Sequence, residues 1–204
     1  MSECKLGNPD ANFSHGAEWV RADFHLHTKA DQKFSYTGDP TYYNSHYINA
    51  LEEAGIRLGV ITNHNKFDHD EFKALRSTAK KQGIGLLPGV ELFINEGHNG
   101  VHVLIVFSDV WLEKGNDYIS PFIDSMFPGK TRDQYQHKNG KSDKNLLQLV
   151  ETLEGLSKDF FLIFAHVEDP KGLWAEVGCG RLKDWTEDRY AAIRRRTLGF
   201  QKVR

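Results

Sequence analysis

Cysteine is scarce in this chain of 204 residues, with Cys4 near the N-terminus and Cys179 between two glycines. Cysteines so few and so far apart do not form a disulfide framework, and they lack the spacing of a zinc knuckle. The sequence therefore excludes a small disulfide-rich protein and a cysteine-ligated zinc module. A reducing compartment fits this composition, and we expect a cytoplasmic protein.

Long apolar runs are also missing, as is an excess of charge of one sign. The apolar stretches are far shorter than a membrane-spanning helix, and the N-terminus lacks the basic start and apolar run of a signal peptide. The formal net charge of -2 argues against a surface built as a whole to bind nucleic acid. Because the apolar stretches are short, we expect no membrane segment.

No glycine-rich phosphate loop of the Walker type occurs, so the chain itself should not hydrolyse ATP by that route.

The chain is long enough for one substantial hydrophobic core, since 39% of its residues are hydrophobic. Residues 1–17 are polar and rich in turn-forming residues, so they predict an N-terminal arm. Residues 18–204 predict one domain. Short apolar runs inside it predict strands at residues 19–26, 58–62, 84–87 continuing as 90–94, 101–107 and 160–165.

Amphipathic stretches between these runs predict helices over residues 43–54, 69–82 and 145–156. Asp68 is typical of a helix N-cap and precedes the second of them. Residues 186–196 predict a further helix, with acids after Thr186 and arginines at the other end. This alternation favours a parallel sheet, open or closed into a barrel, with function at the carboxyl ends of its strands. Residues 111–142 show no sustained period and predict a long loop or lid.

Histidines flank four of the predicted strands, which scattered surface histidines rarely do. His25 and His27 share one face of a strand, where both imidazoles can reach one ion. His64, His102 and His166 flank later apolar runs, and an α/β barrel gathers its strand ends around one rim. The pattern predicts a metal site at that rim, and imidazole ligands suit zinc, manganese and iron alike.

Glu91 is the only acid in the apolar run that contains it. A buried carboxylate is costly unless it is paired with a base or bound to a cation, so Glu91 is predicted to bridge two metals. A salt bridge to an arginine or lysine stays open as the alternative. A hairpin around Gly97-His98-Asn99-Gly100 leaves the register of His102 open, so His98 competes with it, although a solvated turn residue is the expected role of His98. The remaining histidines are expected to be ordinary surface residues: His15, His46, His69 and His137.

Four motifs make these positions more specific. They are His25-Leu26-His27-Thr28, Ile61-Thr62-Asn63-His64-Asn65, Pro88-Gly89-Val90-Glu91 followed by His102, and Ala165-His166. In this order they resemble the first four motifs of the PHP (polymerase and histidinol phosphatase) superfamily, and they span residues 19–167. The amino-acid sequence of residues 59–68 and 86–91 is similar to that of the N-terminal PHP domain of TrlF-type AAA-like ATPases.

The resemblance implies a distorted seven-stranded β/α barrel, TIM-like in form, with two to three divalent metal ions (Zn, Mn or Fe) at its rim. A hydroxide shared by the metals would attack phosphorus in line, with Glu91 and His64 in the catalytic set. The ions would be held by residues of the four motifs: His25, His27 and Glu91 at the first site, Glu91, His102 and His166 at the second, and His64 at a third.

Residues that follow the predicted ligands are candidates for binding a substrate phosphate. They are Lys29, Asn65 and Lys66, and simple solvation is the alternative for each lysine. The second motif departs from the family, because Asn63 stands where an aspartate is common, which weakens the case for the third ion. Asp31 is the candidate for the acid or histidine that many members carry after the first pair.

The family also closes its site with a late Asp-x-His pair, which is absent after Glu176. We therefore expect a barrel that lacks its last strand or strands, as a fragment of a longer protein, with a site of fewer ligands as the alternative. The expected function is a metal-dependent phosphoesterase, the N-terminal part of a larger ATPase-linked protein. The alternatives are an inactive PHP-like structural or regulatory module, and a nuclease that contacts DNA or RNA through the basic residues 181–204.

Overall fold

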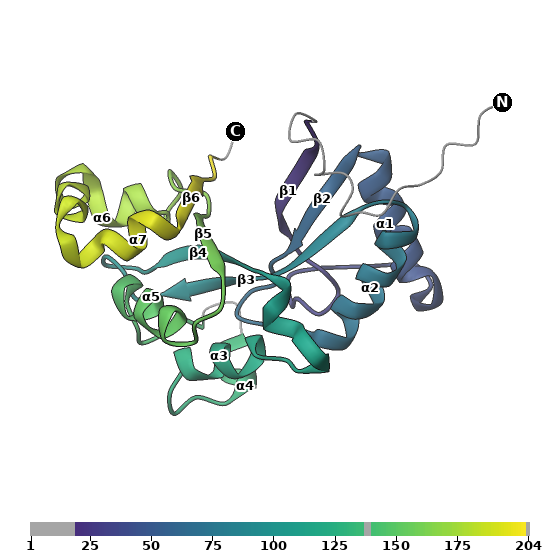
Figure 1. The fold of residues 1–204 in the computed structure, drawn as a ribbon, viewed down its shortest axis with the longest axis horizontal. Coiled ribbons are helices and arrows are strands. Elements are labelled where there is room, and N and C mark those ends of the chain that lie inside the picture. Colours follow the sequence, from purple (N-terminus) through teal and green to yellow (C-terminus); the bar gives the residue numbers. More distant parts are fainter. Residues whose placement is uncertain (1–18, 137–139, 203–204) are drawn as a thin grey trace.

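The computed structural model describes residues 19–136 and 140–202, so the predicted arm at residues 1–17, and with it His15, lies outside the described residues, as does His137. A six-stranded sheet lies at its centre, with the strands in the order of the sequence. The strands are β1 (Arg21–Leu26), β2 (Ile56–Ile61), β3 (Gly85–Ile94), β4 (Val101–Phe107), β5 (Phe160–Phe164) and β6 (Thr197–Phe200). The sheet curls into a half-barrel with β1 and β6 as its outer strands (Figure 1). The seventh strand that the resemblance implies is not among the described residues.

The direction of β4 corrects the expectation of a parallel sheet. β1, β2 and β3 pair in parallel, as do β5 and β6, but β4 runs antiparallel to both of its neighbours. The turn between β3 and β4 contains Gly97 and Gly100, whose φ angles of 68° and 97° suit glycine and let the chain reverse tightly. Because β4 runs backwards, His102 near its start pairs with Phe93 near the end of β3. The reversal thus brings His102 to the same edge of the sheet as the ends of β1 and β2.

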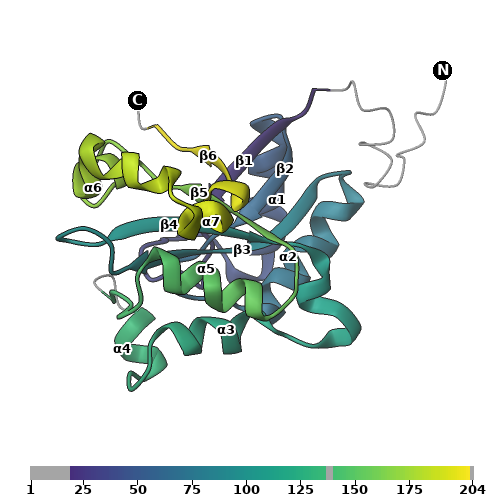
Figure 2. The same ribbon diagram turned by 60° about the vertical axis from the view of Figure 1, so that its left-hand side comes forward.

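Helices cover the outer side of the curled sheet, and Figure 2 shows α5 and α3 beneath it. The α-helices are α1 (Tyr43–Glu53), α2 (His69–Lys81), α3 (Ile119–Met126), α4 (Arg132–Gln136), α5 (Leu146–Gly155), α6 (Leu173–Leu182) and α7 (Ala191–Arg196). The side chain of Asp68 accepts a hydrogen bond from the Glu71 backbone and starts α2, as predicted. Asn145 and Gln148 form a reciprocal capping box at the start of α5. None of the described helices is long and apolar enough to cross a membrane.

Residues 111–142 contain short helices that pack into the core, which corrects the prediction of a long loop or lid. A 3-10 helix at Asp109–Gly115 precedes α3 and α4. Trp111, Phe122 and Tyr135 from this segment are at most 2% exposed, so the segment packs into the core. Its helices are short, α3 having 8 residues and α4 having 5, so neither repeats an apolar pattern often enough to reveal a period.

The C-terminal segment holds a shorter helix than predicted and an additional strand. A 3-10 helix at Asp188–Tyr190 leads into α7, and Thr186 lies outside it, donating its hydroxyl to the Lys183 carbonyl. The chain then enters β6, which has four residues and gave no sequence signal. β6 pairs with β5 and adds an outer strand to the sheet.

The hydrophobic core lies between the sheet and the helices. All seven residues of β4 are buried, as are the last seven of β3. Helices α2 and α5 both bury the apolar face that the spacing of their apolar residues predicted. Complete burial of one large apolar side chain stabilises the fold by roughly 1.5–3 kcal/mol. The residues that pack from these two helices are Phe72, Leu75, Ala79, Leu146, Leu149, Val150 and Leu153. β3 and β4 therefore form a rigid centre on which the residues discussed next are carried.

Candidate metal centre

Five histidines converge on Glu91 at one edge of the sheet. Glu91 lies within β3 and its side chain is 1% exposed. The histidines come from different strands or the residues that follow them: His25 in β1, His27 just after it, His64 after β2, His102 in β4 and His166 after β5. His64 forms an isolated parallel bridge with Glu91 beyond the end of β2. The curvature of the sheet thus assembles residues that are up to 141 positions apart (166 − 25).

Both carboxylate oxygens of Glu91 are faced by imidazole nitrogens. Three of them approach Oε2: His25 Nε2 at 2.8 Å, His64 Nε2 at 3.0 Å and His27 Nε2 at 3.6 Å. Two approach Oε1: His102 Nδ1 at 2.6 Å and His166 Nε2 at 3.4 Å. No arginine or lysine is among these partners of Glu91 in the described part of the chain, so the salt-bridge alternative is replaced by a histidine cluster. Two oxygens with separate sets of nitrogens suit a carboxylate that bridges two cations.

The electrostatics of Glu91 favour a bound cation. Burial would raise its pKa, but hydrogen bonds with His102, His166 and His25 outweigh burial and hold the pKa of Glu91 far below its usual range. The pKa of His102 is lowered, chiefly because burial disfavours its charged form. Burial also opposes the charged form of His25, but its hydrogen bond with Glu91 raises the pKa of His25 on balance. The cluster therefore combines an ionised carboxylate with five imidazoles, and one nitrogen of each ring faces that carboxylate.

Three overlapping groups in the described residues have the geometry to hold metal ions, with ligand atoms within 4.8 Å of one another in each. Every group combines imidazole nitrogen with carboxylate oxygen, the donors that zinc, manganese and iron accept. The groups are His25, His27 and Glu91; His27, Asp31 and His64; and His64, Glu91 and His102. The donor set therefore fits the divalent ions that the sequence resemblance implies, and it offers ligands for more than one ion.

Asp31 joins the cluster from the loop after β1, where the sequence offered it as a candidate. Its Oδ2 lies 2.8 Å from His64 Nδ1 and 3.0 Å from His27 Nδ1, although only the His64 contact has the angles of a hydrogen bond. Burial would raise the pKa of Asp31, but its contacts with His27 and His64 hold that pKa well below the usual range. Both imidazoles turn their Nε2 atoms towards Glu91. Asp31 is therefore placed either to orient these rings or to serve as a ligand itself.

Asn63 lies beneath the cluster rather than in it. The side chain is 2% exposed. Its oxygen accepts the Thr28 backbone N–H at 2.8 Å, and its amide group donates to Thr28 Oγ1 at 2.9 Å. Thr28 Oγ1 in turn donates to the carboxylate of Glu71. The asparagine thus fixes the backbone next to His27, and an aspartate in its place would lose one of these two bonds.

Asn65 is held by the main chain on all sides. Its amide donates to the carbonyls of Tyr135 at 2.8 Å and Gly140 at 2.6 Å, and its oxygen accepts the Phe93 N–H at 3.1 Å. It is 3% exposed and adopts a φ of 49°, a conformation that asparagine tolerates better than most residues. With every polar group engaged, Asn65 ties β3 to the segment after α4 and is not placed to bind a substrate phosphate.

The basic residues near the cluster differ in their placement. Lys33 was not singled out in the sequence, yet its Nζ lies 2.8 Å from His64 Nε2. Lys29 is exposed and its ammonium lies 4.6 Å from the centre of the Tyr43 ring, while Lys66 is half-buried. Among the described lysines, Lys33 thus contacts the histidine cluster, and it lies two residues beyond Asp31.

The competing histidines separate clearly. His98 is exposed in the turn between β3 and β4, and its backbone N–H donates to Glu176. His102 is 7% exposed and contacts Glu91, so the register left open by the sequence is resolved in favour of His102. His46 is exposed and pairs with the Tyr36 hydroxyl, and His69 lies at the start of α2.

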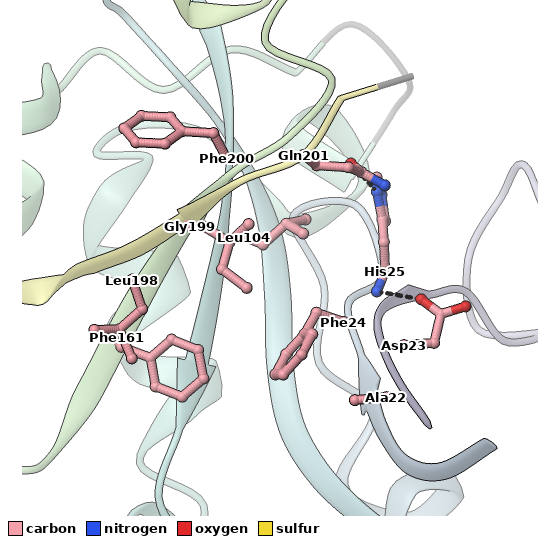
Figure 3. A pocket seen from close by; sticks show the side chains of 11 residues that line it. Ala22, Asp23, Phe24, His25, Leu104, Phe161, Leu198, Gly199, Phe200 and Gln201 are labelled. Atoms are coloured by element: carbon pink, nitrogen blue, oxygen red, sulfur yellow. Dashed lines mark hydrogen bonds between the residues drawn. The ribbon is translucent and has the colours of Figure 1, made fainter. Parts of the chain in front are cut away.

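Gln201 is a further neighbour of the cluster that no sequence pattern indicated. Its Oε1 lies 2.8 Å from His25 Nδ1 and 3.2 Å from the backbone nitrogen of His166. The residue directly follows β6, and Figure 3 shows its side chain extending towards His25. The separation of 176 residues between Gln201 and His25 explains why local patterns could not reveal the contact.

No family model matches this chain, and no curated protein matches it. Solved structures do share its fold. One, named as a metal-dependent phosphoesterase from Bifidobacterium adolescentis, has a TM-score of 0.58 and 14% identity over 89% of this chain and 77% of that chain. Another, an amidohydrolase from Chromobacterium violaceum with bound sulfate and no metal, has a TM-score of 0.52 and 13% identity over 89% of this chain and 76% of that chain. These likenesses show that the chain has the fold of such proteins.

Proposed function

We propose that this chain is a metal-dependent hydrolase of the PHP type that cleaves a phosphoester. The observation that carries the proposal is Glu91, a carboxylate that is 1% exposed and faced on both oxygens by imidazole nitrogens at 2.6–3.6 Å. Isolating a charge in this way is costly unless a cation compensates it. A purely structural cluster would not need five imidazoles around one carboxylate.

The ligands we propose are those that the motifs predicted, supplemented by Asp31. They are His25, His27 and Glu91 for a first ion, Glu91, His102 and His166 for a second, and His64 with Asp31 and His27 for a third. When bound, such ions supply Lewis acidity to a phosphoryl oxygen and lower the pKa of bound water. The protein's own part is to hold Glu91 ionised and buried and to fix the ring planes of the histidines.

Lys33 is the residue we propose for holding the phosphate of the substrate. Its ammonium already reaches His64 at 2.8 Å, so it lies beside the proposed ions on the accessible side. A lysine attracts phosphate as a point charge, and its flexible stem lets it follow the substrate. Lys29 and Lys66 remain further candidates, whereas Asn65 is occupied by the main chain.

The phosphoester class draws support from the name of the Bifidobacterium neighbour, and the amidohydrolase name of the second neighbour defines the comparison that an assay must include. The nuclease alternative loses its main support. Arg195 and Arg196 pair with Glu154, and Arg194 donates to the carbonyls of Trp185 and Glu187, so these arginines serve the packing of α7.

Two finer proposals rest on the resemblance to TrlF-type proteins. The first is that the domain works beside an ATPase in a longer cytoplasmic protein. The second is that a further strand completes the barrel between β1 and β6. An apolar space of about 420 Å³ lies there, lined by Phe24, Leu104 and Phe161 among others (Figure 3), and Leu198 beside it is 68% exposed.

The test is metal content measured together with turnover. The purified protein should bind two or more zinc or manganese ions per chain by elemental analysis. It should hydrolyse a generic phosphate ester but not a matched amide. Glu91→Gln keeps the shape of the side chain and removes its charge. It should lower the metal content, and it should lower kcat at least about 100-fold, roughly the effect of losing one key transition-state contact.

His98→Ala is the matched control, because His98 is an exposed histidine of the turn between β3 and β4, and its described hydrogen bond is from its backbone to Glu176 rather than to the cluster. It should keep metal content and rate. Full metal content without turnover on any ester would favour the inactive structural module. Turnover of the amide alone would exclude the phosphoesterase, and turnover that survives Glu91→Gln would show that the reaction occurs elsewhere.

A further inference from the structure

We propose that Gln201 is a positioning residue that keeps a proton on His25 Nδ1 and thereby reserves His25 Nε2 for the metal centre. The inference rests on the metal centre proposed above and does not depend on the substrate. Gln201 follows β6, whereas His25 lies in β1, so the contact joins the two outer strands of the half-barrel.

The ring of His25 is held from both sides. Its Nδ1 lies 2.8 Å from Gln201 Oε1, and its Nε2 lies 2.8 Å from Glu91 Oε2. Figure 3 shows the Gln201 side chain reaching the ring from the end of β6. Because both nitrogens are engaged, rotation of the imidazole would break one contact or the other. The orientation of the ring is therefore set jointly by Gln201 and Glu91.

The side-chain oxygen of Gln201, rather than its amide nitrogen, must face His25. The same atom accepts the backbone N–H of His166 at 3.2 Å, and a backbone N–H can only donate. Turning the amide over would direct its N–H groups at this donor. Since an oxygen faces Nδ1, that nitrogen must carry the proton. One oxygen thus serves two proposed ligands, the ring of His25 and the backbone of His166.

The consequence appears at the other nitrogen of His25. In a neutral imidazole with its proton on Nδ1, Nε2 has a free lone pair, and here that lone pair points at an oxygen of Glu91. A lone pair alone does not hold Nε2 beside a carboxylate oxygen, so the two atoms are joined either by a proton on Nε2, as in the hydrogen bond described above, or by a metal ion that both can bind. Gln201 therefore fixes Nε2, rather than Nδ1, as the nitrogen through which His25 can bind a metal ion beside Glu91. Hydrogen-bond partners of this kind typically change metal affinity by roughly 10- to 100-fold.

The backbone of Gln201 is fixed independently of its side chain. Its N–H donates to the Phe164 carbonyl at 2.8 Å, and its own carbonyl accepts the Val167 N–H at 2.9 Å. A side-chain substitution therefore leaves the pairing with β5 in place. This makes Gln201→Met a clean test, because methionine has similar length but no strong acceptor. Gln201→Glu restores an oxygen at the same position.

The first measurement uses the metal-free protein, so it does not depend on the proposed function. With 15N-labelled histidine, NMR should show a slowly exchanging His25 Nδ1–H, assigned by its loss in His25→Asn. Gln201→Met should expose this proton to rapid exchange, and Gln201→Glu should protect it again. An Nδ1–H that is absent in the unsubstituted protein, or equally protected in Gln201→Met, would overturn the inference.

The second measurement is zinc affinity by calorimetric titration. Gln201→Met should weaken the binding of zinc by roughly 10- to 100-fold, and Gln201→Glu should retain or strengthen it. Lys202→Met is the matched control, because Lys202 is the exposed next residue and pairs only with Glu168 at the surface. Equal losses in Gln201→Met and Gln201→Glu would overturn the role as an acceptor. If the unsubstituted protein binds no zinc, the proposed metal centre fails, while the NMR result still decides whether Gln201 positions His25.

Discussion

At the scale of single residues, the centre depends on side chains that have no freedom left to adapt. Glu91 faces imidazoles on both oxygens, Asp31 contacts two of those rings, and Gln201 contacts a third from the opposite side. Beneath them, Asn63 and Thr28 exchange two hydrogen bonds. Such a network holds ligands in place before any ion arrives, which lowers the reorganisation that binding requires.

Asn63→Asp provides a test of this supporting layer. The substitution introduces the aspartate that the resemblance leads one to expect here, but the described contacts suit an amide. An aspartate would keep the Thr28 N–H as a donor to one oxygen, but its other oxygen would face Thr28 Oγ1, whose own proton is already donated to Glu71, and would lack a donor. We expect a loss of about 1–3 kcal/mol in the free energy of unfolding, measured by urea denaturation at neutral pH.

Asn49→Asp is the control for that measurement, because Asn49 is exposed on α1 and uses only its oxygen as an acceptor for Gln82. Its unfolding free energy should change by less than about 0.5 kcal/mol. A stable Asn63→Asp protein with stronger metal binding would instead indicate that this position contributes charge to the centre.

Residue types with a strong local context could be predicted from the sequence, and residues defined by tertiary contacts could not. Glu91 stood out because it is an acid inside an apolar run, and the histidines because they flank strands. Lys33 and Gln201 carry no such signal, since one lies in a polar loop and the other follows a four-residue strand. Asn65 had the right position in the sequence but the wrong environment, because the segment that encloses it comes from residues 135–140.

At the scale of elements, β3 is packed too closely at Gly89 to accept a larger side chain. A Cβ added at Gly89 would lie 2.7 Å from Val60 Cγ1, 2.9 Å from Thr62 Cγ2 and 2.9 Å from the Ile105 carbonyl. These neighbours belong to or directly follow the strands on both sides of β3, so they cannot withdraw without moving the sheet. Gly89 and Glu91 lie on the same face of the strand, two residues apart.

Gly89→Ala should therefore destabilise the protein by about 1–3 kcal/mol through overpacking, and it should also weaken metal binding by displacing Glu91. Urea denaturation and zinc titration check the two effects. Gly155→Ala is the control, because nothing lies within 4 Å of the added methyl group at the end of α5. An unchanged unfolding free energy in Gly89→Ala would mean that β3 and its neighbours are less tightly packed than these distances indicate.

The packing of α7 against α5 should depend on pH. Arg196 contacts Glu154 with Nε at 2.9 Å from Oε1 and NH2 at 3.2 Å from Oε2, and this pair lowers the pKa of Glu154. A carboxyl whose pKa is lower in the folded state stabilises the protein above its unfolded pKa, and the contribution is lost as the pH falls through the folded pKa. Because the pair is partly exposed, its contribution should be only about 0.2–1 kcal/mol.

Arg196→Met should therefore be less stable than the unsubstituted protein at neutral pH, and the difference should shrink in acid as Glu154 becomes protonated. Chemical denaturation over a series of pH values, repeated in high salt, measures it. Arg189→Met is the control, since Arg189 pairs with Glu187 at an exposed site. A difference that is constant with pH would assign the effect to lost packing against Phe160, which the Arg196 guanidinium covers.

The elements themselves were predictable in proportion to their length. β4 has the bounds that its apolar run indicated, and α2 starts at its predicted cap. The hairpin between β3 and β4 was predicted from its glycines, but the alternation of strands and helices along the rest of the chain led to the expectation of a parallel sheet. β6, α3 and α4 were missed because segments of four to eight residues show too few repeats of any period.

At the scale of the whole molecule, the half-barrel brings ligands from five separate elements to one edge. The Glu91 carboxylate and the imidazole nitrogens around it lie close together where β1, β2, β3, β4 and β5 meet. An ion bound there would link these strands directly, and it would bind only the folded chain, since the unfolded chain does not keep the ligands together. Metal binding should therefore be coupled to the stability of the entire sheet.

Zinc or manganese should raise the melting temperature of the metal-free protein. At a concentration 100 times the dissociation constant, one ion adds about 2.7 kcal/mol, which corresponds to a rise of roughly 5–10 °C for a domain of this size. Thermal unfolding followed by circular dichroism, with and without a chelator, measures the shift. Glu91→Gln should lose most of it because the carboxylate is shared by two of the three ligand groups, while His98→Ala should keep it. An equal rise in Glu91→Gln would place the ions away from Glu91 and would leave its five histidines without the role that their convergence on one carboxylate indicates.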